Sequence, residues 1–364
     1  MELQNLKEIV NVPSFNTEDN SQIIDLLIKK FKPVSKEILK IKNPNSNKCN
    51  LLVGINTKLQ NINNAIILSG HIDTVPPNTK SYKTNPLSAT LINNKLYGLG
   101  VIDMKCFFAS ILDTATFLQK CSLPIVVAIT ADEETSFYGI KQIVKVLKLK
   151  NIKPLFSIIG EPTNLEVCVS SKCCFEFEVT VFGKSCHSSV PKNGINANYI
   201  LSKIVSFIEK IALTQKNTTA SVGILSGGEA VNIISPKATL RFDIRSDNLK
   251  KVQKLLQNIE KYIKKLKNQY KGAEFETKTL FEIPALENKK SKLINEICDK
   301  LYLVQNEFKA GAEAGYFQQL GSDTIIFGAG NLNLAHKPNE YLVLSDYERY
   351  NQLLLEMINL ISSK

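Results

Sequence analysis

The chain has 364 residues, of which 44% are apolar, and its 45 Lys and Arg against 34 Asp and Glu give a formal net charge of +11. This length and mixed composition exclude a disordered or repetitive protein and favour two globular domains. Apolar runs are far shorter than the ~20 residues of a membrane-spanning helix, and no secretory leader is visible, so we expect a cytoplasmic protein that does not contact a membrane.

The surplus of positive charge is concentrated in residues 250–271, which hold eight Lys and one Glu. Apolar residues recur there at helical spacing, which predicts an amphipathic helix with a solvated lysine face. Only three of the 45 basic residues are Arg, the residue that most often reads nucleic-acid bases. We therefore expect no nucleic-acid binding. The eight cysteines show no Cys-x-x-Cys pair and are expected to be free thiols.

Residues 1–170 alternate short apolar strands with helical segments. The predicted helices lie near 22–31, 105–119 and 138–147, and the predicted strands at 65–69, 125–130 and 156–160. This alternation is typical of an α/β fold, a mixed, mainly parallel sheet flanked by helices. Ligands of such sheets bind beyond the carboxyl ends of the strands.

The pattern changes after about residue 170. A strand, a helix, two strands and the lysine-rich helix follow in order, at 173–182, 196–213, 221–225, 238–244 and 250–271. This order predicts an inserted α+β sandwich. From about residue 281 the α/β character returns, with a helix at 292–303, a strand at 323–327 and a terminal helix from Ser345. We therefore assign 1–170 and 281–364 to one domain and 171–280 to the inserted domain.

Two of the three histidines follow predicted strands. His71 comes just after strand 65–69 and two residues before Asp73. A His-x-Asp pair at a strand end suits a metal-binding imidazole that the aspartate orients, although a histidine that caps a turn explains this spacing equally well. His336 follows strand 323–327 and would be available to a second metal ion. His187 lies in the inserted domain, so it would reach the same edge only from a folded-over domain or from another subunit.

Carboxylates gather at the other predicted strand ends. Glu133 and Glu134 follow strand 125–130, Glu161 follows strand 156–160, and Asp103 precedes a helix. Helix capping explains any one of them but explains the set less well. Carboxylates with histidines on one sheet edge suit a pair of divalent ions and hydrolytic chemistry. We expect one of the adjacent glutamates to bind metal and the other to act as a general base.

Five segments carry a family resemblance, at residues 69–76, 98–105, 132–134, 160–163 and 335–340. In order and spacing they resemble the dinuclear metallo-amidohydrolase and peptidase family, which includes acetylornithine deacetylase, succinyl-diaminopimelate desuccinylase and glutamate carboxypeptidase. The resemblance implies a zinc-peptidase-like catalytic domain interrupted by a lid domain that forms a homodimer. It also implies two divalent metal ions, for which zinc is expected and cobalt is the alternative.

The resemblance also assigns roles to individual residues. His71 and Glu161 would bind one metal ion, Glu134 and His336 the other, and Asp103 would bridge them. Asp73 would orient His71, and Glu133 would be the general base. His187 would reach into the partner's site to stabilise the oxyanion, and Asn232 and Arg245 would bind substrate. Independently, Arg245 suits a substrate carboxylate, although a surface ion pair is the alternative.

The segment 311–317 looks like the acetylornithine deacetylase branch of the family. The predicted reaction is therefore hydrolysis of N2-acetylornithine to ornithine and acetate, a step of arginine biosynthesis, and Glu313 would recognise the cationic end of the substrate directly or through water. A helix-start carboxylate is the alternative for Glu313. For the whole chain, the alternatives are a desuccinylase, a metallo-dipeptidase or carboxypeptidase, and a non-catalytic binding protein on the same scaffold.

Overall fold

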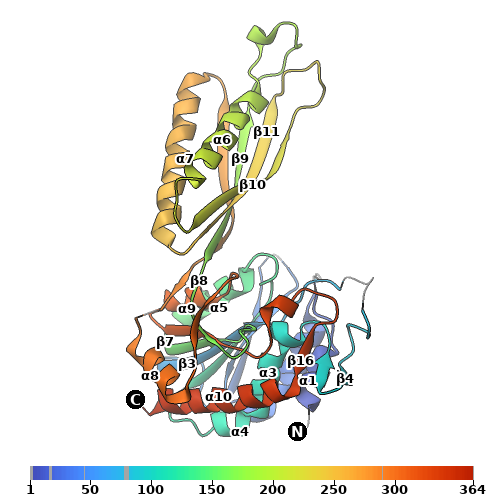
Figure 1. The fold of residues 1–364 in the computed structure, drawn as a ribbon, viewed down its shortest axis with the longest axis vertical. Helices are drawn as coiled ribbons and strands as arrows, with labels where there is room; N and C mark the ends of the chain where they lie inside the picture. Colours follow the sequence, from blue (N-terminus) through green and yellow to red (C-terminus); the bar gives the residue numbers. More distant parts are fainter. Residues whose placement is uncertain (1–2, 16–18, 45, 78–81, 289, 364) are drawn as a thin grey trace. The chain divides into compact units, whose positions relative to one another are not determined.

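The computed structural model describes residues 3–15, 19–44, 46–77, 82–288 and 290–363. The chain divides into two compact units, of which unit 1 comprises Met1–Ser171 and Leu286–Lys364 and unit 2 comprises Lys172–Ala285 (Figure 1). The second boundary lies at 285/286 and not at 280/281, because residues 274–283 form a strand, β12 (Glu274–Ile283), that pairs with unit 2. Its largely polar, exposed pattern hides this strand in the sequence.

Unit 1 is built on a sheet with the strand order β1-β2-β6-β3-β7-β15-β8-β13, and β14 also pairs with β8. The strands are β1 (Glu37–Lys42), β2 (Cys49–Gly54), β3 (Ile62–His71), β6 (Ile125–Thr130), β7 (Ile152–Ile159), β8 (Val167–Ser171), β13 (Leu286–Glu287), β14 (Gln305–Phe308) and β15 (Asp323–Ile326). The central strands β6, β3, β7 and β15 are parallel, and antiparallel pairs flank them. A mixed sheet with a parallel centre confirms the predicted fold class.

Helices cover both faces of this sheet, as the continuous burial of β6 requires. One apolar cluster joins the sheet to α1 (Gln4–Val10), α2 (Ser21–Phe31), α3 (Cys106–Asp113), α8 (Lys292–Leu301) and α10 (Leu344–Ser362). Helices α5 (Tyr138–Leu149) and α9 (Ala314–Gln318) pack on β7 and on each other. A small separate sheet contains β4 (Thr90–Ile92), β5 (Lys95–Tyr97) and β16 (Tyr341–Val343).

The predicted helix 105–119 is two helices, α3 and α4 (Ala115–Leu118), which meet at Thr114. The hydroxyl of Thr114 donates to the carbonyl of Ser110 at 2.7 Å, beside the backbone N–H of Thr114, which donates to the same carbonyl at 3.0 Å. The backbone of Thr114 itself leaves the helical region, at φ −102° and ψ 4°, and apolar periodicity does not reveal this change.

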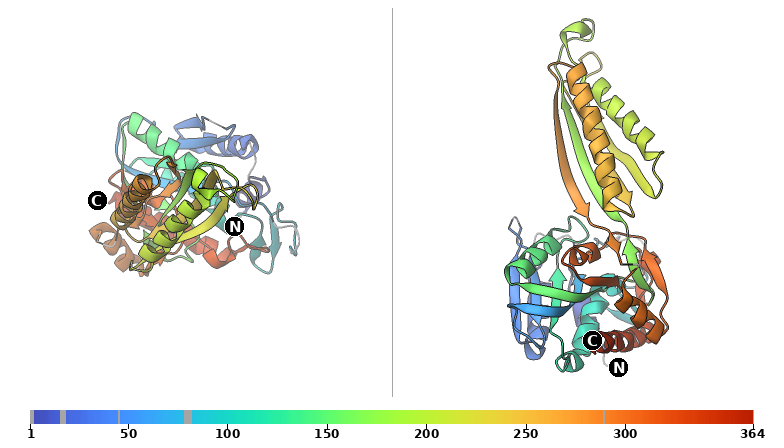
Figure 2. Two further views of the ribbon diagram at one scale, coloured as in Figure 1. Left: turned by 90° about the horizontal axis from the view of Figure 1, so that it is seen from above. Right: turned by 90° about the vertical axis from the view of Figure 1, so that its left-hand side faces the viewer.

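Unit 2 is the α+β sandwich that the sequence predicts. Its sheet has the order β10-β11-β9-β12, with β9 (Cys173–Phe182), β10 (Thr218–Gly227) and β11 (Lys237–Ser246). Helices α6 (Ala197–Ala212) and α7 (Leu249–Gln269) lie on one face of this sheet (Figure 2, right). Alternate residues of β11 are buried against them, and the lysine side of α7 is exposed. Within the described residues, no helix has the length and apolarity to cross a bilayer.

Candidate metal centre

The carboxyl ends of three neighbouring strands carry most of the predicted metal ligands. His71 is the last residue of β3, Glu133 and Glu134 follow β6, and Glu161 follows β7. Because β3 pairs in parallel with both β6 and β7, these ends meet at one edge of the sheet. Asp103 reaches the same edge from the segment that leads into α3.

The carboxylate of Asp103 lies between two imidazoles. Its Oδ1 is 3.0 Å from Nε2 of His71, and its Oδ2 is 3.0 Å from Nε2 of His336. Nε2 of His336 is also 2.9 Å from Oε1 of Glu134, and Nε2 of His71 is 3.8 Å from Oε1 of Glu161. Two groups of ligand atoms, each within 4.8 Å of one another, therefore share Asp103: one adds His71 and Glu161, the other Glu134 and His336.

Glu133 lies beside these groups, with its Oε2 4.0 Å from Nε2 of His71. A third set of ligand atoms within 4.8 Å joins His71, Glu133 and Glu134. Of the two glutamates, Glu134 is the one with a close contact to His336. This difference favours Glu134 as the metal ligand and leaves Glu133 available as a base.

Most side chains of this cluster are buried, whereas that of His336 is about half exposed. Burial raises the pKa of Glu133 and of Glu161, and neighbouring carboxylates add to the effect. Burial by itself would lower the pKa of His71, but the surrounding carboxylates, Glu133 and Asp103 among them, raise it overall. Buried carboxylates that outnumber the imidazoles are costly without compensating cations. The imidazole nitrogens and carboxylate oxygens of the cluster are donors that suit zinc, cobalt or manganese. The residues present therefore fit a pair of divalent ions.

Asp73 contacts both His71 and the turn that carries Glu133 and Glu134, but its carboxylate is not hydrogen-bonded to the imidazole. Nδ1 of His71 lies 2.9 Å from the backbone carbonyl of Asp73, whereas the carboxylate Oδ1 is 3.8 Å away. The carboxylate instead accepts the backbone N–H groups of Glu133, at 3.3 Å, and Glu134, at 3.1 Å. Asp73 therefore holds the imidazole with its backbone and the two-glutamate turn with its side chain.

A second group of polar side chains holds the residues just before Glu133, which are Ala131 and Asp132. Asn43 donates to Oδ2 of Asp132 at 2.9 Å, and Lys48 forms an ion pair with Oδ1 of the same carboxylate. Asn50 donates to Oδ1 of Asn43 at 2.8 Å, and its own Oδ1 accepts the N–H of Ala131 at 2.9 Å. The β1–β2 hairpin thus fixes the residue before Glu133. These partners lie more than 80 positions away in the sequence, where no motif marks them.

Two glycines let α3 approach the strand ends closely. A Cβ on Gly70 would meet the side chain of Met104, and a Cβ on Gly160 would meet the ring of Phe107. A larger residue at position 160 would clash with this ring, and one at position 70 would require Met104 to move. The segment that carries Asp103 is therefore packed directly against the ends of β3 and β7.

Glu313 lies just before α9 and is 1% exposed. Its Oε2 accepts the hydroxyl of Ser69 at 3.2 Å, and burial raises its pKa to about 7. Its carboxylate therefore contacts β3 two residues before His71. Its contact with a substrate stays a prediction.

The predicted site residues of unit 2 fall into two places. His187 and Asn232 belong to loops that lie together, because the N–H of Ser188 donates to the carbonyl of Asn232 at 2.9 Å and His187 forms a bridge with Ile233. Arg245 lies near the far end of β11, where its Nε donates to Asp243 at 2.9 Å. Eight residues of strand separate Arg245 from the end of β11 nearest the loops, which is about 26 Å.

Comparison with known proteins agrees with this architecture. A family model described as "Peptidase family M20/M25/M40" matches residues 67–360. The chain belongs to peptidase family M20/M25/M40. An acetylornithine deacetylase of Buchnera aphidicola subsp. Schizaphis graminum is 31% identical over 98% of this chain and 96% of that protein.

Solved structures show the same fold. A tripeptidase of Staphylococcus aureus superposes with a TM-score of 0.78 and 22% identity, over 100% of this chain and 98% of that one. A dinuclear metal-binding M20 peptidase of Bacillus subtilis superposes with a TM-score of 0.73 and 15% identity, over 100% and 97% of the two chains.

Membership of the M20/M25/M40 family makes this chain a metal-dependent amidohydrolase of a dinuclear type. The family resemblance that the five segments predict is thereby confirmed, and so is the prediction of an enzyme.

Proposed function

We propose that this M20 protein hydrolyses the amide bond of N-acyl amino acids, with N2-acetylornithine as its substrate and ornithine and acetate as its products. The observation that carries the proposal is the position of Asp103, whose two oxygens each face a different imidazole at 3.0 Å. The relative named acetylornithine deacetylase, which matches nearly the whole chain, supports this substrate. A cytoplasmic location is part of the same proposal.

His71 and Glu161 would hold one ion, Glu134 and His336 the other, and Asp103 would contact both. Two divalent ions in these positions, with zinc as our assignment, would polarise the amide carbonyl and make a water molecule more acidic. Glu133 would take the proton from the attacking water and deliver it to the leaving amine nitrogen. Asp73 would keep Glu133 in place through the backbone contacts described above.

Substrate recognition would use side chains of both units. A guanidinium binds a carboxylate through two parallel hydrogen bonds, so Arg245 would hold the α-carboxylate of the substrate. Asn232 would bind the substrate through its amide, and His187 would donate to the oxyanion that forms when water attacks the carbonyl. Glu313 would recognise the cationic end of the side chain, directly or through water.

The distance between Arg245 and the His187 loop within unit 2 supports a homodimer. Arg245 and the loop of His187 lie about 26 Å apart along the sheet, which is longer than an acetylated amino acid. One unit 2 therefore does not bring both side chains to a single substrate. In the proposed dimer, each site uses its own Arg245 and the His187 of the second copy.

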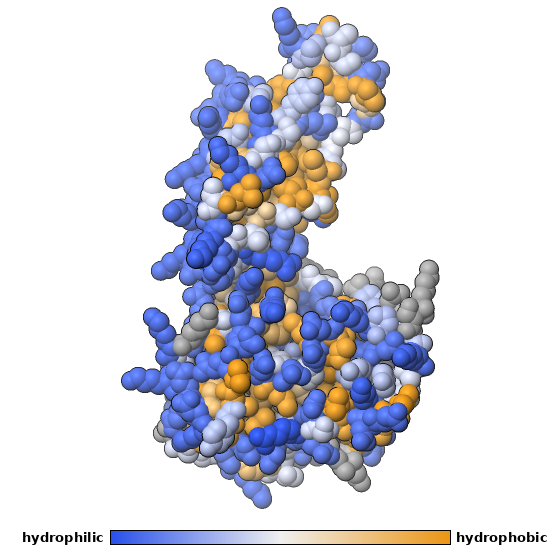
Figure 3. Space-filling model, viewed as in Figure 1, coloured by the Kyte–Doolittle hydropathy of each residue, from blue (hydrophilic) through white to orange (hydrophobic). Residues whose placement is uncertain are grey.

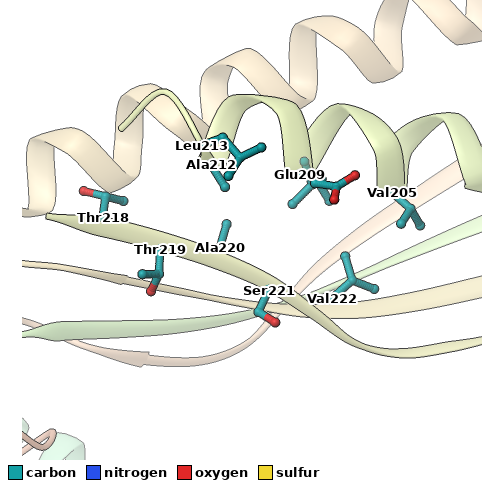
Figure 4. Close-up of a pocket in the computed structure, with 10 residues that line it drawn as sticks. Val205, Glu209, Ala212, Leu213, Thr218, Thr219, Ala220, Ser221 and Val222 are labelled. Carbon is teal, nitrogen blue, oxygen red and sulfur yellow. The ribbon is translucent and has the colours of Figure 1, made fainter. Parts of the chain in front are cut away.

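Unit 2 offers a surface for this second copy. β10 is an edge strand of its sheet, and apolar residues gather on the surface near α6 and β10 (Figure 3). A groove of about 480 Å³ runs between these two elements, where Ala220 and Val222 point toward α6 and Leu213 is 83% exposed (Figure 4). An open strand edge beside an apolar groove suits pairing with an identical copy.

The test is release of free amine from N-acetylornithine, N-succinyl-diaminopimelate and N-acetylmethionine, before chelation, after chelation and after zinc is restored. We expect zinc-dependent turnover with a preference for N-acetylornithine. A preference for the succinylated compound would make the chain a desuccinylase. Turnover that survives complete chelation would contradict the metal centre itself.

A further inference from the structure

Glu340 is a buried carboxylate that the mechanism above does not use. It is 3% exposed, and its two oxygens accept two backbone N–H groups: Oε2 that of Gly100 at 2.9 Å, and Oε1 that of Ile102 at 2.8 Å. The carbonyl of Glu340 accepts a third, from Gly98, at 3.3 Å. Three contacts therefore join one residue to the segment that leads directly into Asp103.

Glu340 also lies four residues after His336, on the same loop. Its carboxylate thus connects the segment of Asp103 to the loop of His336, and these are the two side chains whose ligand atoms lie 3.0 Å apart. His71 and Glu161, in contrast, lie at the ends of paired strands. Neither Asp103 nor His336 lies in a strand, so their separation depends on contacts between loops.

The buried amine of Lys105 does not replace these contacts. Lys105 is 2% exposed, and its Nζ donates to the carbonyl of Val12 at 2.7 Å. A buried carboxylate is costly, and the two N–H groups that it accepts offset part of that cost. An apolar residue at position 340 would avoid the cost but would leave both N–H groups without an acceptor. The carboxylate is therefore suited to setting the position of the backbone at 100–102.

We propose that Glu340 is a positioning residue for the second metal ion, because it sets the distance between the carboxylate of Asp103 and the imidazole of His336. This inference rests on the two-ion site of the proposed function. Glu340 touches neither substrate nor metal in this arrangement. It acts through the backbone of Gly100 and Ile102.

The test measures metal binding to the metal-free protein and does not depend on turnover. Glu340→Gln puts an amide NH₂ against one of the two N–H groups, at nearly unchanged volume. Co²⁺ titration followed by visible absorption, together with Zn²⁺ competition against a chelator, gives the two affinities separately. We expect the second ion to bind about 10–100-fold more weakly in Glu340→Gln, with an altered cobalt spectrum. The first ion should change less, because His71 and Glu161 remain on their strands.

Glu37→Gln is the matched control, because Oε2 of Glu37 also accepts a backbone N–H, that of Leu59, at 2.7 Å. It lies on β1, outside the metal ligands, and should leave both affinities unchanged. If Glu340→Gln does not fold, Glu340→Asp keeps the charge on a shorter side chain and should show the same selective loss.

Each result distinguishes the inference from the proposed function. Wild-type protein that binds fewer than two ions contradicts the proposed function. Wild-type protein that binds two, with a variant of equal affinities, overturns only the role of Glu340, even if the variant melts at a lower temperature. Failure of both variants to fold would make Glu340 a residue of the fold alone and would also overturn the inference.

Discussion

Complementation between two inactive variants tests whether His187 acts in the site of a second copy. His187→Ala removes the proposed oxyanion donor and should lower kcat/KM by about 10²–10³-fold. Arg245→Ala removes the proposed carboxylate contact. If each site uses its own Arg245 and the partner's His187, a mixed dimer holds one site with both residues intact and one site with neither. Its activity should therefore be about half that of the wild type.

The assay uses the two variants with different affinity tags, co-expressed and purified through both tags in turn, so that only mixed dimers remain. Their kcat/KM for N-acetylornithine is compared with that of each variant alone. The expected recovery follows from the roughly 26 Å of strand between Arg245 and the end of β11 nearest the His187 loop. A mixed dimer as inactive as its parents would refute action across the dimer, and failure to isolate any mixed dimer would refute the dimer.

Three further predictions concern single residues. Glu133→Ala should lose turnover by 10²-fold or more while it keeps two metal ions by elemental analysis, and loss of metal with turnover intact would exchange the roles of Glu133 and Glu134. Glu313→Ala should lose the preference for N-acetylornithine over N-acetylmethionine, and an unchanged ratio of kcat/KM would remove its role in recognition. Asn43→Leu, which deletes the bonds to Asp132 and Asn50, should lower the free energy of unfolding by about 1–3 kcal/mol in urea titrations and lower kcat without loss of metal. A variant with wild-type kcat would show that the hairpin does not position Glu133.

Part of the candidate metal centre was predictable because three of its side chains come at or shortly after the ends of apolar strands. His71 ends β3, Glu134 follows β6 and Glu161 follows β7, whereas Asp103 and His336 lie outside the strands and were assigned as ligands by the family resemblance. The contacts that hold the site were not predictable. Asn43 and Glu340 act through hydrogen bonds to residues far away in the sequence, and such bonds leave no periodic pattern.

The contacts of Asp73 differ from those that its place in the sequence suggests. Its position two residues after His71 suggests a bond between its carboxylate and the imidazole, but the carboxylate accepts the backbone N–H groups of Glu133 and Glu134. The missed strand β12 has a different cause. Its mainly polar, exposed residues give a sequence pattern that is typical of a loop. Only the pairing with β9 identifies this segment as a strand.

The position of β15 has a consequence for the synthesis of this protein. β15 lies between β7 and β8 in the sheet, but it begins at Asp323, 152 residues after β8 ends at Ser171 (323 − 171 = 152). At roughly 5–20 residues per second, a ribosome needs about 8–30 seconds to make the intervening chain. All of unit 2 is synthesised during that interval. Strands β7 and β8 are made before it, and the strand that lies between them in the sheet is made after it. His336 is synthesised later still, so the candidate metal group of His71, Asp103 and Glu161 is present in the growing chain long before the group that includes His336.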